Sequence, residues 1–121
     1  MNNPNPTLDV DQIITDTIDR VHGTLHHIPD YMHEGIMAYL KEGRQPGDFL
    51  QAVLENNLHK AVARADTENQ MRLTGYAIVL DRLPFISWGS EEKVTNWINQ
   101  GGLKGHFKYK APNEDTDDGG I

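Results

Sequence analysis

The densest group of side chains that could carry out chemistry lies between residues 22 and 34. It consists of His22, His26, His27, Asp30, His33 and Glu34. On a helix, Asp30 would stand three residues before His33 and four before Glu34, so that all three share a face and could hold a metal ion. The zinc-protease pattern needs a Glu directly after the first of two His four apart, but here Gly23 follows His22. We favour a solvated linker with titratable imidazoles. The alternative is a metal-dependent hydrolase that uses His26, Asp30, His33 and Glu34.

Other catalytic arrangements are missing from the sequence. A Gly-x-Ser-x-Gly elbow does not occur, and Ser87 and Ser90 fall where a turn and a helix cap explain them. Gly43 and Gly47 are not followed by the Lys-Ser or Lys-Thr of a phosphate-binding loop. We therefore expect neither an enzyme nor a bound cofactor.

Polar residues at the ends of apolar segments, together with two aromatic residues, suggest a binding surface instead. The candidates are Phe49, Asn56, Asn57, Asp66, Asn69 and Trp88. Convergent polar groups beside apolar faces are typical of a ligand or peptide pocket. The commoner explanation is capping and turn chemistry for the polar residues and burial in the core for the aromatic ones.

Helices are predicted for the segments that carry these residues. Apolar side chains three and four residues apart predict helices over 9–23, 29–43, 48–65, 66–83 and 90–101. The first of these segments also suits a strand, and Asn56-Asn57 leaves either one helix or two short ones for the third. The fold class is therefore all-α, a compact bundle of four to five short helices with flexible N- and C-terminal tails.

Several residues should fix the limits of these helices. Asp9 and Ser90 are suited to N-caps, and Gly43 and Gly101 to helix stops. Residues 76–80 are apolar without interruption, so that turn has no solvent face and we expect it at the centre of the fold.

The chain divides into four parts by composition. They are a flexible leader (1–8), an acidic N-terminal helix and linker (9–27), a helical core domain (28–103), and a basic-aromatic arm with an acidic disordered tail (104–121). Residues 104–110 alternate in polarity and could form an isolated strand or a docking arm. A core of this size is modest, and association into a homo-oligomer would hide more apolar surface.

Composition excludes several classes of protein. The chain has no cysteine, which rules out disulfide scaffolds, thiolate zinc sites, iron–sulfur clusters and cysteine nucleophiles. With 11 Lys and Arg against 18 Asp and Glu, the net charge is −7, and no basic face favours direct nucleic-acid binding. We find no apolar run that could span a membrane and no secretory signal, and we therefore expect a cytoplasmic protein.

The acidic N-terminal segment supports a second alternative. Asp9, Asp11, Asp16 and Asp19 could imitate a row of phosphates. The protein would then act as a nucleic-acid mimic that occupies a basic DNA- or RNA-binding host protein.

The middle of the chain resembles a family of small proteins from tailed phages and prophages. The residues that carry the resemblance are Ile28-Pro29, Glu34-Gly35, Gly43, residues 46–54 (Pro-Gly-Asp-Phe-Leu-Gln-Ala-Val-Leu), Asn56, Leu58, Ala65-Asp66, Asn69, Trp88-Gly89-Ser90 and Trp97. The resemblance covers residues 28–103, and the Pro-Gly-x-Phe-Leu-x-Ala-Val-Leu stretch is its most specific part. Members often have Asn-Asp-Leu where this chain has Asn56-Asn57-Leu58.

That family has no assigned biochemical activity, so the resemblance implies a phage context without a mechanism. The sequence as a whole predicts an accessory protein that acts by stoichiometric, non-enzymatic binding. It would modulate a host or phage component, either a protein or a small ligand, in the cytoplasm of the host cell.

Overall fold

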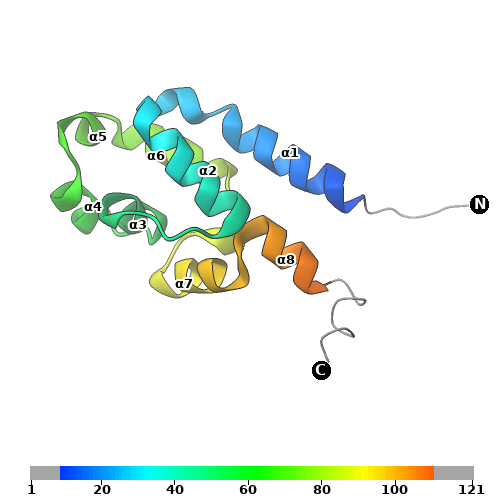
Figure 1. The fold of residues 1–121 in the computed structure, drawn as a ribbon. Coiled ribbons are helices and arrows are strands. Elements are labelled where there is room, and N and C mark those ends of the chain that lie inside the picture. The colour runs from blue at the N-terminus through cyan, green and yellow to red at the C-terminus, as the bar shows by residue number, and fades with distance from the viewer. Residues whose placement is uncertain (1–8, 111–121) are drawn as a thin grey trace, which may run out of the picture.

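A computed structural model describes residues 9–110, and the all-α expectation is confirmed over that range (Figure 1). The elements are α1 (Val10–His22), η1 (Leu25–His27), η2 (Asp30–Met32), α2 (His33–Glu42), α3 (Asp48–Leu54), α4 (Leu58–Arg64), α5 (Thr67–Met71), α6 (Leu73–Arg82), η3 (Phe85–Ser87), α7 (Glu91–Gln100) and α8 (Gly102–Lys110). The expected leader (1–8) and acidic tail (111–121) lie outside the described residues.

The predicted number of four to five helices is wrong for this part of the chain, which holds eight α-helices and three short 3-10 helices. Two of the extra α-helices arise because single residues leave the helical conformation, and the third, α8, lies where no helix was predicted. Asn56 has a left-handed backbone with φ 63°, so the segment 48–65 forms two short helices, α3 and α4. Arg72, with φ −113° and ψ 18°, separates α5 from α6 within the segment predicted as one helix.

The caps predicted from the sequence are confirmed. Asp9 accepts a hydrogen bond from the Gln12 backbone N–H at 3.2 Å, and Ser90 accepts one from the Lys93 N–H at 3.1 Å. Gly43 and Gly101 end α2 and α7 in the left-handed conformation, with φ 70° and 87°.

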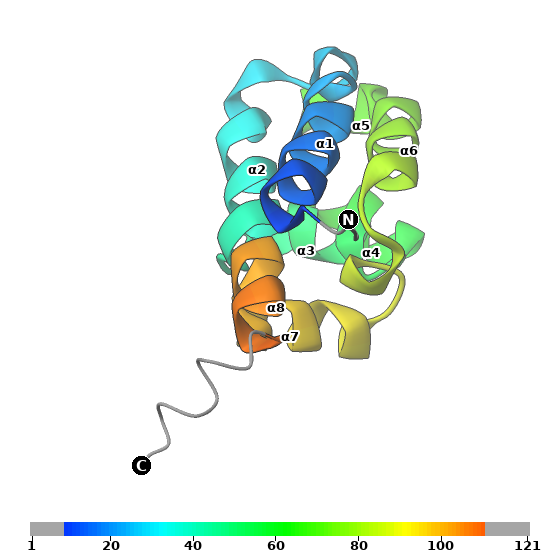
Figure 2. The ribbon, with the colours of Figure 1, turned by 90° about the vertical axis from the view of Figure 1, so that its right-hand side faces the viewer.

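Helix α2 lies at the centre of the molecule. Its residues Ile36, Tyr39 and Leu40 are fully buried. Residues 76–80 of α6 were expected in that place, but only Tyr76 and Val79 of that turn are buried, and Ala77 is exposed. Helix α6 lies beside η1 and α1, its Tyr76 packs against Phe49 of α3, and its remaining surface faces solvent (Figure 2).

Two buried aromatic residues join α2 to the C-terminal third of the chain. The Trp97 indole Nε1–H donates to the Tyr39 carbonyl oxygen at 2.8 Å. The Tyr39 hydroxyl donates to the Ser87 carbonyl oxygen at 2.5 Å. A buried donor or acceptor that loses its partner costs free energy, so these bonds fix α7 and η3 on α2. Burial also raises the pKa of the Tyr39 hydroxyl, which keeps it a donor.

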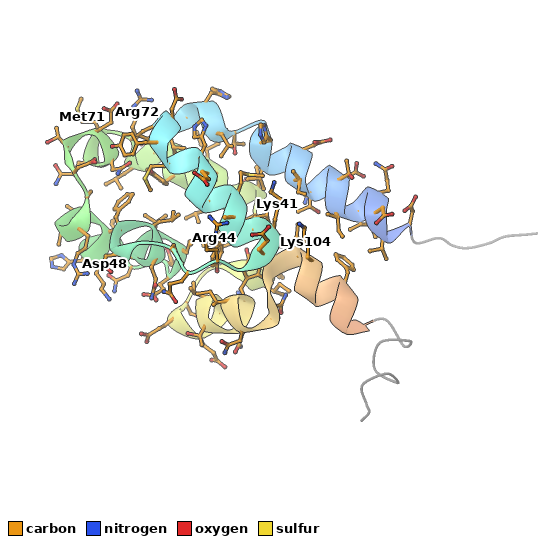
Figure 3. All side chains as sticks on the ribbon, viewed as in Figure 1. Lys41, Arg44, Asp48, Met71, Arg72 and Lys104 are labelled. Carbon is orange, nitrogen blue, oxygen red and sulfur yellow. The ribbon has the colours of Figure 1, made fainter. Side chains whose placement is uncertain are left out.

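The strand expected as one possibility for residues 104–110 is wrong, because these residues belong to α8, while the docking arm stays a prediction. Consecutive left-handed glycines, Gly101 and Gly102, turn the chain so that α8 returns along α2 (Figure 2). Leu103 is buried. The Nζ of Lys104, which Figure 3 labels, lies 3.7 Å from a Glu42 carboxylate oxygen.

Two helix-interior glycines should respond oppositely to substitution by alanine. A Cβ at Gly75 would lie 2.1 Å from the His27 carbonyl oxygen, whereas a Cβ at Gly35 would meet its nearest neighbour, a Leu50 methyl, at 3.9 Å. We expect Gly75→Ala to destabilise the protein by about 1–3 kcal/mol through overpacking. Gly35→Ala should stabilise it by about 0.5–1 kcal/mol, because alanine lowers the entropy cost of a helix. Urea denaturation of both variants measures the two effects, and equal shifts of the same sign would contradict the close contact of α6 with η1.

Candidate functional site

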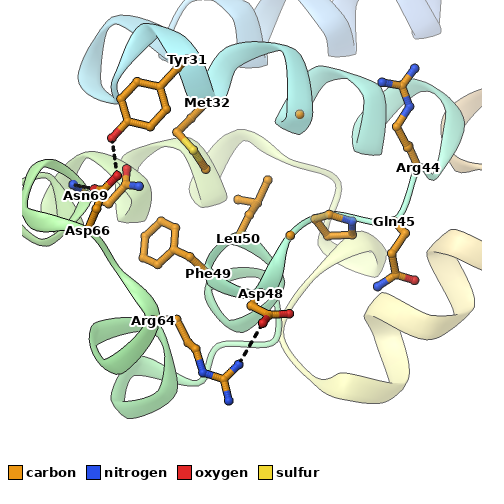
Figure 4. Close-up of a pocket in the computed structure, with 13 residues that line it drawn as sticks. Tyr31, Met32, Arg44, Gln45, Asp48, Phe49, Leu50, Arg64, Asp66 and Asn69 are labelled. Atoms are coloured by element: carbon orange, nitrogen blue, oxygen red, sulfur yellow. Dashed lines mark hydrogen bonds and ion pairs between the residues drawn. The ribbon is translucent and has the colours of Figure 1, made fainter.

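A pocket of about 420 Å³ opens between the start of α2, the loop after α2, α3 and α5 (Figure 4). Met32, Phe49 and Leu50 form its apolar part, and the buried Asn69 lies at its edge, next to Asp66. The exposed rim is polar and consists of Tyr31, Arg44, Gln45, Asp48, Arg64 and Asp66. An apolar cavity with a few directed polar groups is the usual composition of a binding site.

Turn chemistry brings these residues together. Pro29 has an extended backbone that begins η2, and this short helix carries Tyr31 and Met32 to the pocket. Gly43 ends α2 in a left-handed conformation, and the following residues lead to Gly47, the N-cap of α3. Phe49 and Leu50 therefore enter the core from the first turn of α3, with their side chains beneath the pocket.

Asp66 connects the rim to α5. Its two carboxylate oxygens accept hydrogen bonds from the Asn69 backbone N–H and from the Tyr31 hydroxyl, both at 2.8 Å. These two donors, the N–H foremost, hold the pKa of Asp66 below its ordinary value of 3.8. The hydrogen bond between Tyr31 and Asp66 also raises the pKa of the Tyr31 hydroxyl to about 12. Asp66 is therefore ionised at neutral pH, and Tyr31 is protonated.

Asn69 connects this rim to the core. Its side chain is only 4% exposed, and its Oδ1 accepts a hydrogen bond from the Tyr76 hydroxyl at 2.6 Å. The Tyr76 ring in turn packs edge-on against Phe49, with 5.1 Å between ring centroids. Burial raises the pKa of Tyr76, so its hydroxyl stays a donor. The position of Phe49 thus depends on Asn69 through Tyr76.

Two arginines on the rim form ion pairs. A guanidinium nitrogen of Arg64 lies 3.4 Å from an Asp48 carboxylate oxygen. Arg44 lies 3.5 Å from Glu42 and 3.9 Å from Glu34. The side chains of both arginines and of their acidic partners are 45% exposed or more, so these ion pairs contribute little to the stability of the fold. They balance the charge of the rim.

The structure brings together three of the six predicted binding residues, Phe49, Asp66 and Asn69. Asn56 and Asn57 line a second groove of about 190 Å³ between α4 and α6. There Asn57 caps α4 by accepting from the Lys60 N–H at 3.0 Å, and Asn56 makes the left-handed turn before it. Trp88 lines neither cavity, because it follows η3 and packs half-buried against the core.

Several residues of the pocket were not predicted. Tyr31, Arg44 and Arg64 come from three different segments, and nothing in their local sequence distinguishes them from other exposed residues. One feature of the sequence could have indicated that Arg64 lies near Asp66. The two are only two residues apart, so the end of α4 lies beside the N-cap of α5.

The residues proposed for a metal-dependent hydrolase do not form a cluster. Across residues 9–110 no group of three or more His, Asp or Glu side chains could hold a metal ion. His33 Nε2 lies 3.1 Å from the Ile28 carbonyl oxygen and 4.0 Å from an Asp30 oxygen. His26 packs against His27 instead, at 4.1 Å between ring centroids, and Glu34 lies beside Arg44.

Two of the four acidic residues at the N-terminus make local hydrogen bonds in or beside α1. Asp9 is the N-cap, and Asp16 accepts from the Gln12 side chain at 2.8 Å. Asp9 has an extended backbone outside the helix, and at about 100° per residue Asp11, Asp16 and Asp19 spread over about 140° of the surface of α1. The imitation of a phosphate row by these residues stays a prediction.

Comparison with protein-family models, curated proteins and solved structures gives no match for this chain. Within residues 9–110, none of the helices has the length and apolar character that crossing a bilayer requires.

We expect Tyr31→Phe to raise the pKa of Asp66 toward 3.8, because the variant removes one of the two donors to the carboxylate. Because the folded-state pKa is lowered, Asp66 stabilises the protein above about pH 4, and this contribution disappears as the pH falls through that pKa. The stability difference between the two proteins should therefore shrink at acid pH. NMR titration of the Asp66 carboxyl carbon measures the shift. Tyr31→Phe keeps the ring, and an unchanged Asp66 pKa would contradict the hydrogen bond.

Proposed function

We propose that the protein acts by stoichiometric, non-enzymatic binding and that the pocket beneath Tyr31 and Asp66 receives a group from a host or phage component. The observation that supports this most directly is the buried Asn69 amide at the edge of an apolar pocket. The resemblance of residues 28–103 to small phage proteins supports the phage context and, with it, the host cytoplasm as the location.

The state of the titratable groups in the pocket also supports binding over acid–base catalysis. The Asp66 carboxylate is held ionised by two hydrogen bonds, and its lowered pKa makes it a poor proton donor at neutral pH. Asp48 is paired with Arg64. The Tyr31 hydroxyl, with a pKa of about 12, stays protonated at neutral pH, so it is a poor proton donor and is not available as a phenolate base.

The role of the pocket can be tested by filling it. Gly35 lies on the exposed side of α2 and lines the pocket, and a Cβ fits there without a close contact. We expect Gly35→Met to abolish capture of the partner from infected cells while the protein stays folded. Native mass spectrometry of the wild-type complex should show a fixed ratio of chain to partner.

Thr95→Met is the matched control, because Thr95 is an exposed helical residue on α7 that does not line the pocket. It should retain the partner. If Gly35→Met and Thr95→Met retain it equally, or if neither protein nor small molecule is captured by the wild type, the proposal fails.

A further inference from the structure

The buried Asn69 side chain has one hydrogen-bonding group in use and one free. Its Oδ1 accepts from Tyr76, and its backbone N–H donates to Asp66. Its Nδ2 has no hydrogen-bond partner among residues 9–110, although the side chain is only 4% exposed. Figure 4 shows the amide between Tyr31 and Phe49, at the edge of the pocket. A buried amide donor without a partner is costly, so this geometry is suited to a ligand that supplies an acceptor oxygen.

The part of the pocket beside this amide is apolar. Met32, Phe49 and Leu50 present carbon and sulfur atoms, and Phe49 is held in place by the Tyr76 ring. Such a surface gains free energy by covering an aliphatic or aromatic group. The ligand must therefore combine an apolar body with an adjacent acceptor.

The charges around the pocket leave no excess of either sign for a charged ligand. Arg64 is paired with Asp48, and Arg44 lies between two acids. The Asp66 carboxylate already accepts two hydrogen bonds. Each charged group on the rim thus already has an opposite charge or hydrogen-bond donors beside it, with which a charged ligand would have to compete. An uncharged group fits this balance best.

We propose that the pocket binds an uncharged apolar residue of a partner protein, whose own backbone carbonyl accepts a hydrogen bond from the Asn69 Nδ2. In a peptide, an apolar side chain and a carbonyl oxygen occur together in every such residue. The exposed rim, where Tyr31 is 59% exposed, leaves room for the main chain to run across the surface while one side chain enters. This inference rests on the proposed binding function and names the chemistry of recognition.

The probe for this inference is N-acetyl-L-phenylalaninamide, which carries an aromatic side chain, two carbonyls and no charge. Titration of the ¹⁵N-labelled full chain should move the Asn69 side-chain NH₂ resonances with a dissociation constant on the order of 1 mM, as expected for so few atoms. Gly35→Met should weaken binding at least about tenfold, and Thr95→Met should leave it unchanged. Asn69→Asp keeps the acceptor for Tyr76 but removes the donor, and should weaken binding similarly.

Two further probes distinguish other ligands. Tighter binding of N-acetyl-L-aspartate would show an anion site, and tighter binding of adenosine would show a site for heterocycles; either result overturns the inference. Unmoved Asn69 resonances, or shifts that persist in Gly35→Met, would also overturn it. If Asn69→Asp does not fold, Gly35→Met decides the question. Partner capture that depends on Gly35 while these probes fail would leave the binding function standing and remove only the recognition chemistry.

Discussion

Large aromatic residues are buried in the small core of this protein, and the need to give their polar atoms hydrogen-bond partners organises the fold. Tyr39 is fully buried, and both its hydroxyl and its carbonyl oxygen have partners far away in the chain, Ser87 and Trp97. Each of these hydrogen bonds requires a narrow range of distances and angles, whereas apolar side chains can pack in many arrangements. The two bonds therefore set where η3 and α7 lie on α2, and α8 follows from the glycine turn after α7.

The same principle connects the core to the pocket. Tyr76 is buried, and its hydroxyl needs an acceptor, which Asn69 provides. This contact draws the short helix α5 toward the core, and its cap Asp66 then lies within reach of Tyr31. The pocket is thus built from a chain of hydrogen bonds that starts inside the protein and ends at its surface. A ligand that accepts a hydrogen bond from the Asn69 amide would add one more hydrogen bond to this series.

The binding function and the fold make different demands on the candidate residues. Asn57 is explained by its cap on α4, and Asn56 by the left-handed turn that precedes it. Asn69 is different, because the fold uses only part of its hydrogen-bonding capacity while hiding the whole side chain. Polar groups that the fold does not satisfy are the ones that point to a ligand.

The amino-acid sequence was sufficient to predict the helical class, the caps at Asp9 and Ser90, and the stops at Gly43 and Gly101, because these depend on interactions between residues at most a few positions apart. It also identified Phe49, Asp66 and Asn69 as candidates. The packing of distant segments, by contrast, placed α2 and not α6 at the centre, residues 104–110 in a helix along α2, and Tyr31 and Arg64 in one pocket with Asn69. These features arise from contacts between segments that are distant in the chain, and local periodicity carries no information about which segments meet.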